Sequence, residues 1–295
     1  MRRLAMVAVF AVACGATAAH AQTLALAYHA GDVHKYSFHS TATENIATGA
    51  ITVPVTIDMS AQETVTVRSV DSSGVADLSV ALSSIVIKGQ ANGVTNSTTG
   101  LTLPAQEIKI AADGRLLSVN GISSEGGFPF GMGTGGDLVS AVLPDKPVSP
   151  GDRWSKDYDQ ANPLGSGPIH VTSKSKYLRD ESFQGVSAAV VETASSAAVD
   201  FTIDTSALGP PTPGTSGPST FPLPKTGMQG IKIRGTTTSD VTTWIDPNGR
   251  RILKSHMTSK TSANLSFVLA PGSALPGLIG PMSIQGSATV DVLPA

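Results

Sequence analysis

The sequence predicts a mainly β protein, with duplicated antiparallel curved sheets arranged as a half-barrel or a sandwich and with little helix. Three observations lead to this class. Apolar and polar residues alternate over long stretches, which is typical of strands that bury one face. The chain of 295 residues is rich in Thr, Ser, Val, Ala and Gly, and only 5% of its residues are aromatic. A Gly-Asp pair followed by an aromatic residue opens each half of the chain.

The alternation defines the expected strands, taken in chain order. Residues 52–61 place apolar side chains on one face and mostly polar ones on the other. After a turn at 71–74 the pattern returns at 76–82, and it recurs at 197–203 and 265–269 in the second half. Because little helix is available to cover these faces, the sheets must curl or pack on each other. We expect one shared concave apolar surface, formed by Val53, Val55, Ile57, Ala76, Leu78, Val80, Val199, Phe201 and Ile203.

A faint internal repeat divides the chain. The pairs Gly31-Asp32 and Gly151-Asp152 precede expected strands, and Gly114 and Gly249 lie in expected turns between strands. The distance in sequence from Gly151 to Gly249 exceeds that from Gly31 to Gly114 by 15 residues, which is the length of the run from Pro210 to Pro224. Prolines cannot donate to a strand ladder, so this run is expected to be an insertion. We predict a first β-rich half at 22–146 and a second at 147–295, with the Pro-rich insertion at 209–224.

The first residues have the composition of an export signal. Arg2 and Arg3 form a basic start, residues 4–13 are apolar, and Ala19-His20-Ala21 matches a small-residue cleavage motif. The apolar stretch has about ten residues, whereas a bilayer span needs roughly 20. We therefore expect a signal peptide at 1–21, a mature chain without a membrane span, and a location in the periplasm or outside the cell.

Cys14 is the only cysteine of the chain, and two outcomes are open for it. Cleavage after Ala21 removes Cys14 and leaves a mature chain without a thiol or a disulfide. If the sequence Ala11-Val12-Ala13-Cys14 acts as a lipobox instead, Cys14 becomes an acylated first residue. The protein is then lipid-anchored.

Charge and motifs argue against several functional classes. Charged residues make up 14% of the chain and form no basic stripe, so the footprint of a nucleic-acid-binding protein is missing. No motif assembles a nucleophile, a base and an oxyanion site, and we expect no catalytic residues and no enzyme. The segment from Gly131 to Gly136 matches a dinucleotide fingerprint by letters only, outside any strand–helix context. We expect neither a cofactor nor a metal site.

Candidate ligand-binding residues follow from the curved-sheet interpretation. A curved sheet whose concave side is incompletely filled would hold an apolar cavity. The Gly-rich segment 121–136 contains Phe128, Phe130 and Met132, which are expected to line or gate the mouth of that cavity. The concave surface itself contributes Leu78, Val80 and Phe201 to the candidate site.

The stretch L-P-D-K-P-V-S-P-G-D-R-W at 143–154 resembles a segment that recurs in exported bacterial proteins of a domain-of-unknown-function family. Members of that family also open with a G-D-x-x-x-Y strand, which here runs from Gly31 to Tyr36. The resemblance covers nearly the whole mature chain. It implies a secreted or envelope β-rich protein and supplies no catalytic residues. More distantly, the curved-sheet architecture resembles the half-barrels of periplasmic lipoprotein and lipid carriers.

Two functions are expected from these observations. The first is a non-enzymatic envelope protein whose curved sheet binds a hydrophobic small molecule, such as a lipid or an acyl chain. The alternative is a structural or protein-interaction module of the cell envelope, with another envelope protein as its partner and no small-molecule ligand. An internal apolar cavity favours the first function, and a filled core favours the second.

Overall fold

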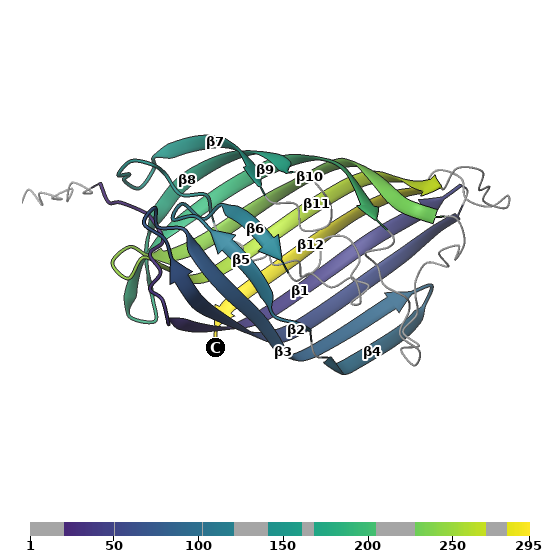
Figure 1. Cartoon of the computed structure of the whole chain (residues 1–295), viewed down its shortest axis with the longest axis horizontal. Coiled ribbons are helices and arrows are strands. Elements are labelled where there is room, and N and C mark those ends of the chain that lie inside the picture. Colours follow the sequence, from purple (N-terminus) through teal and green to yellow (C-terminus); the bar gives the residue numbers. More distant parts are fainter. Residues whose placement is uncertain are drawn as a thin grey trace, which may run out of the picture.

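The structure is a computed structural model that describes residues 21–49, 51–101, 103–120, 141–160, 168–204, 228–269 and 282–295. Within these ranges the chain forms strands and no helix, so the predicted mainly β class is confirmed (Figure 1). Residues 1–20 of the predicted signal peptide, which include Cys14, lie outside the described ranges. So do the Gly-rich residues Phe128, Phe130 and Met132 and the Pro-rich insertion. No helical segment of the described ranges has the length and hydropathy of a membrane span.

All the strands of the described ranges belong to one antiparallel sheet. Its order is β6-β5-β3-β2-β1-β12-β11-β10-β9-β8-β7, and β4 pairs with β3 off this path. The pairing of β1 with β12 joins the two halves of the chain into a single sheet. The strands are β1 (Val33–Thr48), β2 (Ile51–Val70), β3 (Ala76–Ala91), β4 (Val94–Leu101), β5 (Gln106–Ile110), β6 (Leu116–Asn120), β7 (Arg153–Gln160), β8 (Ile169–Phe183), β9 (Val186–Asp204), β10 (Met228–Asp246), β11 (Arg251–Leu269) and β12 (Met282–Pro294).

The sheet curls until its two edges approach each other. In Figure 1 the short strands β5 and β6 lie over the long central strands, at the end that carries the C-terminus. β6 contacts β7, the strand at the opposite edge. The sheet has two wings, one that ends in β6 and one that ends in β7. Apolar residues from both wings share one cluster at this end, so the wings face each other. Of the predicted alternatives, the structure therefore has the barrel-like one.

We call the cluster at this closed end the end core. It joins residues of β2, β3, β5 and β6 to residues of β8, β9 and β10, and two non-strand segments fill the space between them. These segments are residues 22–28, the N-terminal segment, and residues 141–148, the connector. The end core consists of Leu24, Leu26, Val65, Val67, Ala76, Leu78, Val80, Ile108, Ile110, Leu116, Ala141, Leu143, Val148, Tyr177, Ala189, Val191 and Ile245.

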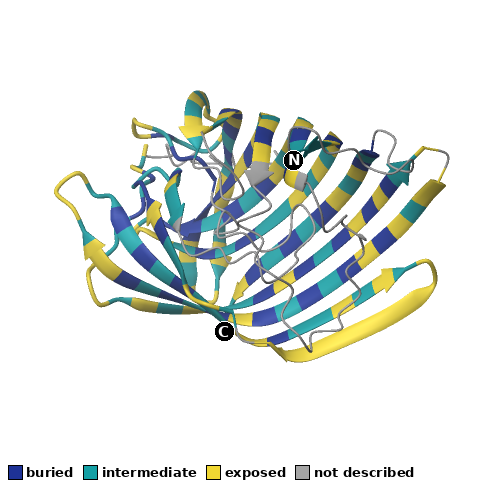
Figure 2. Cartoon of the chain, turned by 45° about the vertical axis from the view of Figure 1, so that its right-hand side comes forward, coloured by how far each residue is buried: buried dark blue, intermediate teal, exposed yellow. Residues whose placement is uncertain are grey.

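A second cluster, the wall core, lines the central strands. It runs across the sheet from β3 to β9 and is built from alternate residues of each strand. Figure 2 shows the corresponding alternation of buried and exposed positions along the strands. The wall core consists of Phe38, Ala42, Ile46, Val55, Ile57, Met59, Ala61, Ile85, Phe201, Ile233, Val241, Ala263, Leu265, Met282, Ile284, Ala288, Val290 and Val292.

The two Gly-Asp pairs adopt the same backbone arrangement. Gly31 donates its N–H to the carbonyl of Val67 on β2, and the N–H of Val67 returns to the carbonyl of Asp32. Gly151, Asp152 and Tyr177 of β8 repeat this exchange at the start of β7. The φ angles are +95° at Gly31 and +100° at Gly151, which a residue without a Cβ adopts readily.

Irregularities of the ladders also recur in matching places. A register shift follows Val67 in the β2–β3 pair, and another follows Tyr177 in the β8–β9 pair. The β5–β6 ladder shifts just before Ile110, as the β10–β11 ladder does just before Ile245. The turns that follow contain Gly114 and Gly249, so both glycines lie in turns as predicted.

Candidate functional site

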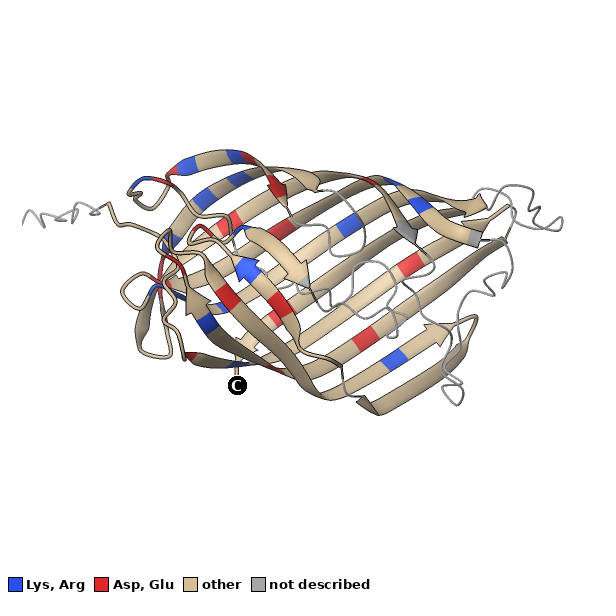
Figure 3. Cartoon of the chain, viewed as in Figure 1, with Lys and Arg blue, Asp and Glu red and all other residues tan. Residues whose placement is uncertain are grey.

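The candidate site is the inner face of the curled sheet, which we define as the face that carries the end core and the wall core. On β1 this face holds Phe38, Ala42 and Ile46, and the residues between them on the other face include His39, Thr43 and Asn45, which are exposed. The outer face is polar. Figure 3 shows charged residues on many strands, gathered mainly at the end that carries the C-terminus.

Two adjoining rows of the inner face consist of small residues. One row runs from Ala197 through Thr237 and Thr261 to Gly286, and the other runs from Ser195 through Ser239 and Ser259 to Ala288. We call these eight residues the small-residue band. Both rows continue onto β1, where the first meets Glu44 and the second meets Ala42. At a strand spacing of ~4.8 Å, the distance from β9 to β1 is about 19 Å.

The small-residue band is incompletely buried. Apart from Ala288, all of its residues are only half-buried. Toward the closed end it is bordered by Val241, Met257 and Val290. On the other side the next row consists of Val199, Gly235, Ala263 and Ile284, and beyond it lie the large buried side chains of Phe201, Ile233, Leu265 and Met282. The inner face therefore has little side-chain volume at its middle and apolar rows above and below.

Glu44 is the acidic residue at the end of the band. It occupies the same face as Ala42 and Ile46, and its whole residue is 4% exposed. Burial raises the pKa of its carboxyl group to about 7. The Oε2 atom of this carboxyl is buried without a hydrogen-bond partner among the described residues. Burial of a carboxyl group without a hydrogen-bond partner costs folding free energy, so packing alone does not explain a Glu at this position.

Gly286 makes room for the Glu44 side chain. The two residues are directly opposite each other on β12 and β1. A Cβ atom at position 286 would lie 2.9 Å from Cγ of Glu44 and 3.1 Å from the carbonyl oxygen of Thr43. The absence of a side chain on Gly286 therefore lets Glu44 extend over the neighbouring strand, toward the small-residue band.

Ser40 is a second unpartnered polar residue on the same face of β1. It is 1% exposed, and its Oγ atom has no hydrogen-bond partner within the described ranges. Ser40 lies four positions before Glu44, a distance of roughly 13 Å along a strand. The inner face of β1 thus presents two polar groups, one on each side of Ala42, in an otherwise apolar stretch.

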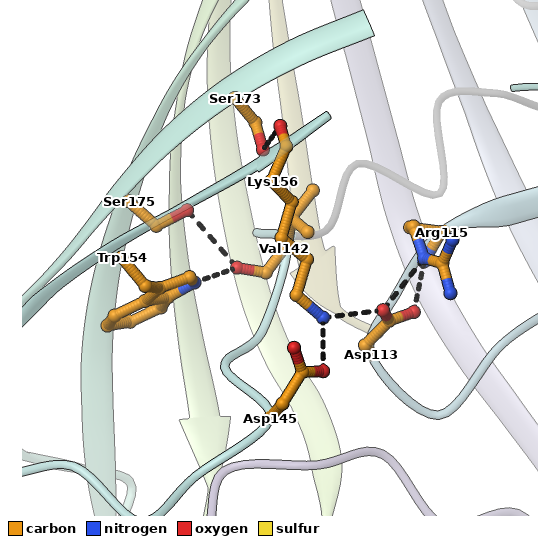
Figure 4. A network of polar contacts seen from close by, with 8 residues as sticks. All are labelled: Asp113, Arg115, Val142, Asp145, Trp154, Lys156, Ser173 and Ser175. Carbon is orange, nitrogen blue, oxygen red and sulfur yellow. Dashed lines mark hydrogen bonds and ion pairs between the residues drawn. The ribbon is translucent and has the colours of Figure 1, made fainter. Parts of the chain in front are cut away.

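Hydroxyl groups near the closed end are, in contrast, paired with the connector (Figure 4). Ser175 donates to the carbonyl of Val142 at 3.1 Å, and Trp154 Nε1 donates to the same carbonyl at 2.7 Å. The amide of Ala141 donates to Oγ1 of Thr243 at 2.9 Å. The chain itself therefore supplies the partners for the inner-face hydroxyls at this end.

Lys156 holds the connector in place. Its ammonium group lies 2.8 Å from a carboxyl oxygen of Asp113 and 2.7 Å from one of Asp145 (Figure 4). Arg115 contacts the same Asp113 carboxyl at 2.7 Å. Burial works to raise the pKa of Asp113, but the hydrogen bonds and positive charges of Lys156 and Arg115 hold that pKa below its usual range. We interpret this network as structural, because it ties the connector to β7 and to the turn that contains Asp113.

A small cavity of about 20 Å³ lies between the N-terminal segment and the central strands. Tyr36 donates to the carbonyl of Ile252 there at 3.2 Å, and burial raises the pKa of Tyr36 to about 12. Burial also lowers the pKa of His34. The volume suits one water molecule. The lining residues are Tyr28, His34, Tyr36, Val65, Arg251, Ile252, Ser255 and Val292.

The structure divides the predicted candidate residues between the two cores. Leu78 and Val80 lie in the end core, whereas Phe201 lies in the wall core. The predicted residues of the shared apolar surface lie on the inner face but in two separate clusters of it: Ala76 accompanies Leu78, and Val55 and Ile57 accompany Phe201. The physical reason is that the N-terminal segment and the connector fill the closed end. Leu78 is fully buried there, with no surface left for a ligand.

Sequence reasoning missed Glu44 and the small-residue band. A signal for Glu44 was present, since Phe38, Ala42 and Ile46 alternate with polar residues and Glu44 falls in the apolar register. The band was harder to find. Its members come from four strands, and only the pairing of β9, β10, β11 and β12 brings them together.

Comparisons with known proteins give distant likenesses to solved structures. No protein-family model and no curated protein matches the sequence. A solved structure that addresses lipid–protein interactions in lipovitellin superposes on 91% of this chain with a TM-score of 0.47 and 11% sequence identity. This chain covers 26% of that lipovitellin chain. No functional conclusion rests on this likeness.

Proposed function

We propose that the protein is a non-catalytic binding protein that holds a hydrophobic or amphiphilic small molecule against the inner face of its curled sheet. The observation that carries this proposal is the half-buried small-residue band, with large apolar residues of the inner face on both sides of it. Protein interiors are normally filled to a high density. A wall of Ser, Thr, Ala and Gly beside large apolar side chains supplies the mixed lining that is typical of small-molecule sites.

A fluorescence titration tests the proposal. The probe is N-phenyl-1-naphthylamine, an uncharged apolar dye, excited where tryptophan does not absorb. We expect saturable binding by the wild type. The variant Thr237→Trp places a large side chain in the small-residue band and should weaken binding about tenfold or more by occupying the same space.

The matched control is Thr238→Trp, which changes the next residue of β10. Thr238 is exposed on the outer face. The control should bind the dye like the wild type, and both variants should keep the circular-dichroism spectrum of a β protein. Absence of saturable dye binding by the wild type overturns the proposal. Equal weakening by both variants overturns the assignment of the site to the inner face.

A second candidate is the interaction module, and β4 favours it. All eight residues of β4 are exposed, and among the strands of the described ranges β4 pairs with β3 alone. One edge of β4 therefore offers backbone groups to which another strand could be added. A wild type that binds no dye but captures an extended peptide along β4 would support this candidate.

We also propose that the protein is exported and that its halves descend from one repeated unit. The basic, apolar and small-residue segments of residues 1–21 support export. The matching hydrogen bonds of Gly31 and Gly151, together with the matching register shifts, support the repeat. Intact-mass measurement of the protein recovered from its producing cells tests export. A first residue at Gln22 is expected, and an acylated Cys14 would replace that expectation by the lipid-anchored form.

A further inference from the structure

We propose that Glu44 selects the ligand by its head group, favouring amphiphiles whose head donates hydrogen bonds, with amines above all. This inference rests on the proposed function and names the ligand class of the same inner face. It starts from the buried carboxyl atom Glu44 Oε2, which has no hydrogen-bond partner among the described residues. Glu44 lies on the inner face of β1, among residues of the wall core.

The chemistry of a carboxyl group sets the preference. An ionised carboxylate only accepts hydrogen bonds, so an ammonium or a hydroxyl head satisfies it, whereas a second carboxylate is repelled. Hydrogen bonds to charged groups are also stronger than those between neutral groups. An amine therefore gains the most from Glu44, an alcohol gains less, and a fatty-acid anion is disfavoured.

No competing charge neutralises Glu44 from the strands packed beside it. Its inner-face neighbours are Val55 and Ile57 on β2, and Ile284, Gly286 and Ala288 on β12. None of these residues is titratable. Burial is also the sole cause of the raised pKa of Glu44, so no described charged group compensates it. A cation supplied by a ligand would provide the missing charge.

The surroundings of Glu44 give the head group space and the tail an apolar path. Gly286 lacks a side chain opposite Glu44, and the band continues from there with Thr261 and Thr237, whose hydroxyls lie 3.1 Å apart. A head at this level would have hydroxyls on one side and the carboxyl on the other. The tail would run away from the closed end, along Ile46, Ile284, Leu265, Ile233 and Phe201.

Competition against bound N-phenyl-1-naphthylamine tests the inference. Three competitors carry the same dodecyl chain and differ only in the head: dodecylamine, dodecanol and dodecanoate. At about pH 8, where the Glu44 carboxyl is mainly ionised, we expect the wild type to bind the amine about tenfold or more tightly than the carboxylate. At about pH 5.5 Glu44 is protonated, and this ratio should fall.

Two variants assign the preference to Glu44. Glu44→Gln keeps the size of the side chain and removes its charge, so the amine-to-carboxylate ratio should collapse toward one and lose its pH dependence. The control Glu192→Gln removes an exposed outer-face carboxyl on β9 and should keep the wild-type ratio. If Glu44→Gln binds the dye and retains the wild-type ratio, the head-group inference is wrong and the proposed function stands. If the wild type binds neither the dye nor a dodecyl competitor, both are wrong.

Discussion

The end core and the small-residue band occupy the same face of the same sheet, yet they are completed in different ways. In the end core, large side chains such as Leu78, Ile108 and Tyr177 are fully buried. The N-terminal segment and the connector fill the space between the wings. The band has small side chains, and beside it Glu44 and Ser40 carry buried atoms without a described partner.

The two regions differ in the hydrogen-bond partners of their inner-face polar groups. At the closed end, Ser175 and Thr243 form hydrogen bonds with backbone groups of the connector, so the chain itself supplies the partners of these hydroxyls. Buried polar groups in proteins are nearly always paired in such a way. Groups in the middle of the wall that have no partner among the described residues therefore stand out, and for Glu44 our proposal supplies the partner as a bound ligand.

The largest expected effect is in the end core. Leu78→Ala should lower the free energy of unfolding by about 2–5 kcal/mol, because it removes a fully buried side chain and leaves a cavity. Urea unfolding followed by circular dichroism measures this change. Val33→Ala is the control, since Val33 is 53% exposed, and it should change stability by less than about 0.5 kcal/mol. Equal effects of the two variants would contradict a filled end core.

The next effect concerns Glu44 and pH. Its pKa is raised from 4.5 to about 7 in the folded protein, so the folded state binds this proton more tightly than the unfolded state. The contribution of Glu44 to stability is therefore highest below pH 4.5 and declines as pH rises through about 7. The full decline amounts to about 3 kcal/mol.

Urea unfolding of the wild type and Glu44→Gln across this pH range measures that decline. Other titrating groups are common to both proteins, so the difference between the two curves isolates Glu44. We expect the variant to gain on the wild type as pH rises. Glu192→Gln should follow the wild-type curve. A constant difference between wild type and Glu44→Gln would mean that the carboxyl is not desolvated by the wall.

The smallest of the three effects on stability concerns the close packing of β10 against β11 in the wall core, as distinct from ligand binding. Gly235 borders the band on β10, and a Cβ atom there would overlap the carbonyl oxygen of Ser262 and lie 2.5 Å from Cα of Ala263. Backbone atoms cannot move aside as a flexible side chain can. Gly235→Ala should therefore cost about 1–3 kcal/mol in thermal or urea unfolding.

Gly89→Ala is the matched control. A Cβ atom at Gly89 meets nothing within 4 Å, so this substitution should be neutral or slightly stabilising. Thr237→Trp, two positions from Gly235, should affect dye binding more than stability. If Gly235→Ala changes the free energy of unfolding as little as Gly89→Ala does, then β10 and β11 are not as closely packed near the band as the structure indicates.

The accuracy of the sequence interpretation varied with the range of the interactions. The turns around Gly114 and Gly249, and the strand faces at 53–61 and 76–80, depend on neighbours in sequence and were predicted correctly. The division of that surface into two clusters, with Leu78 and Val80 in one and Phe201 in the other, was not predicted, because two segments remote in sequence fill the closed end. Phe128, Phe130 and Met132 lie outside the described residues, so their role stays a prediction.

By itself, the sequence determined the strand class, the alternation that separates an inner from an outer face, and the positions of glycine-containing turns. These features follow from a period of two and from local backbone preferences. Only the tertiary structure decided that β1 pairs with β12 and that the wings close over the connector. The same pairings align eight small residues beside Glu44. Pairing between distant strands depends on the whole sheet and its curvature, and no local pattern specifies it.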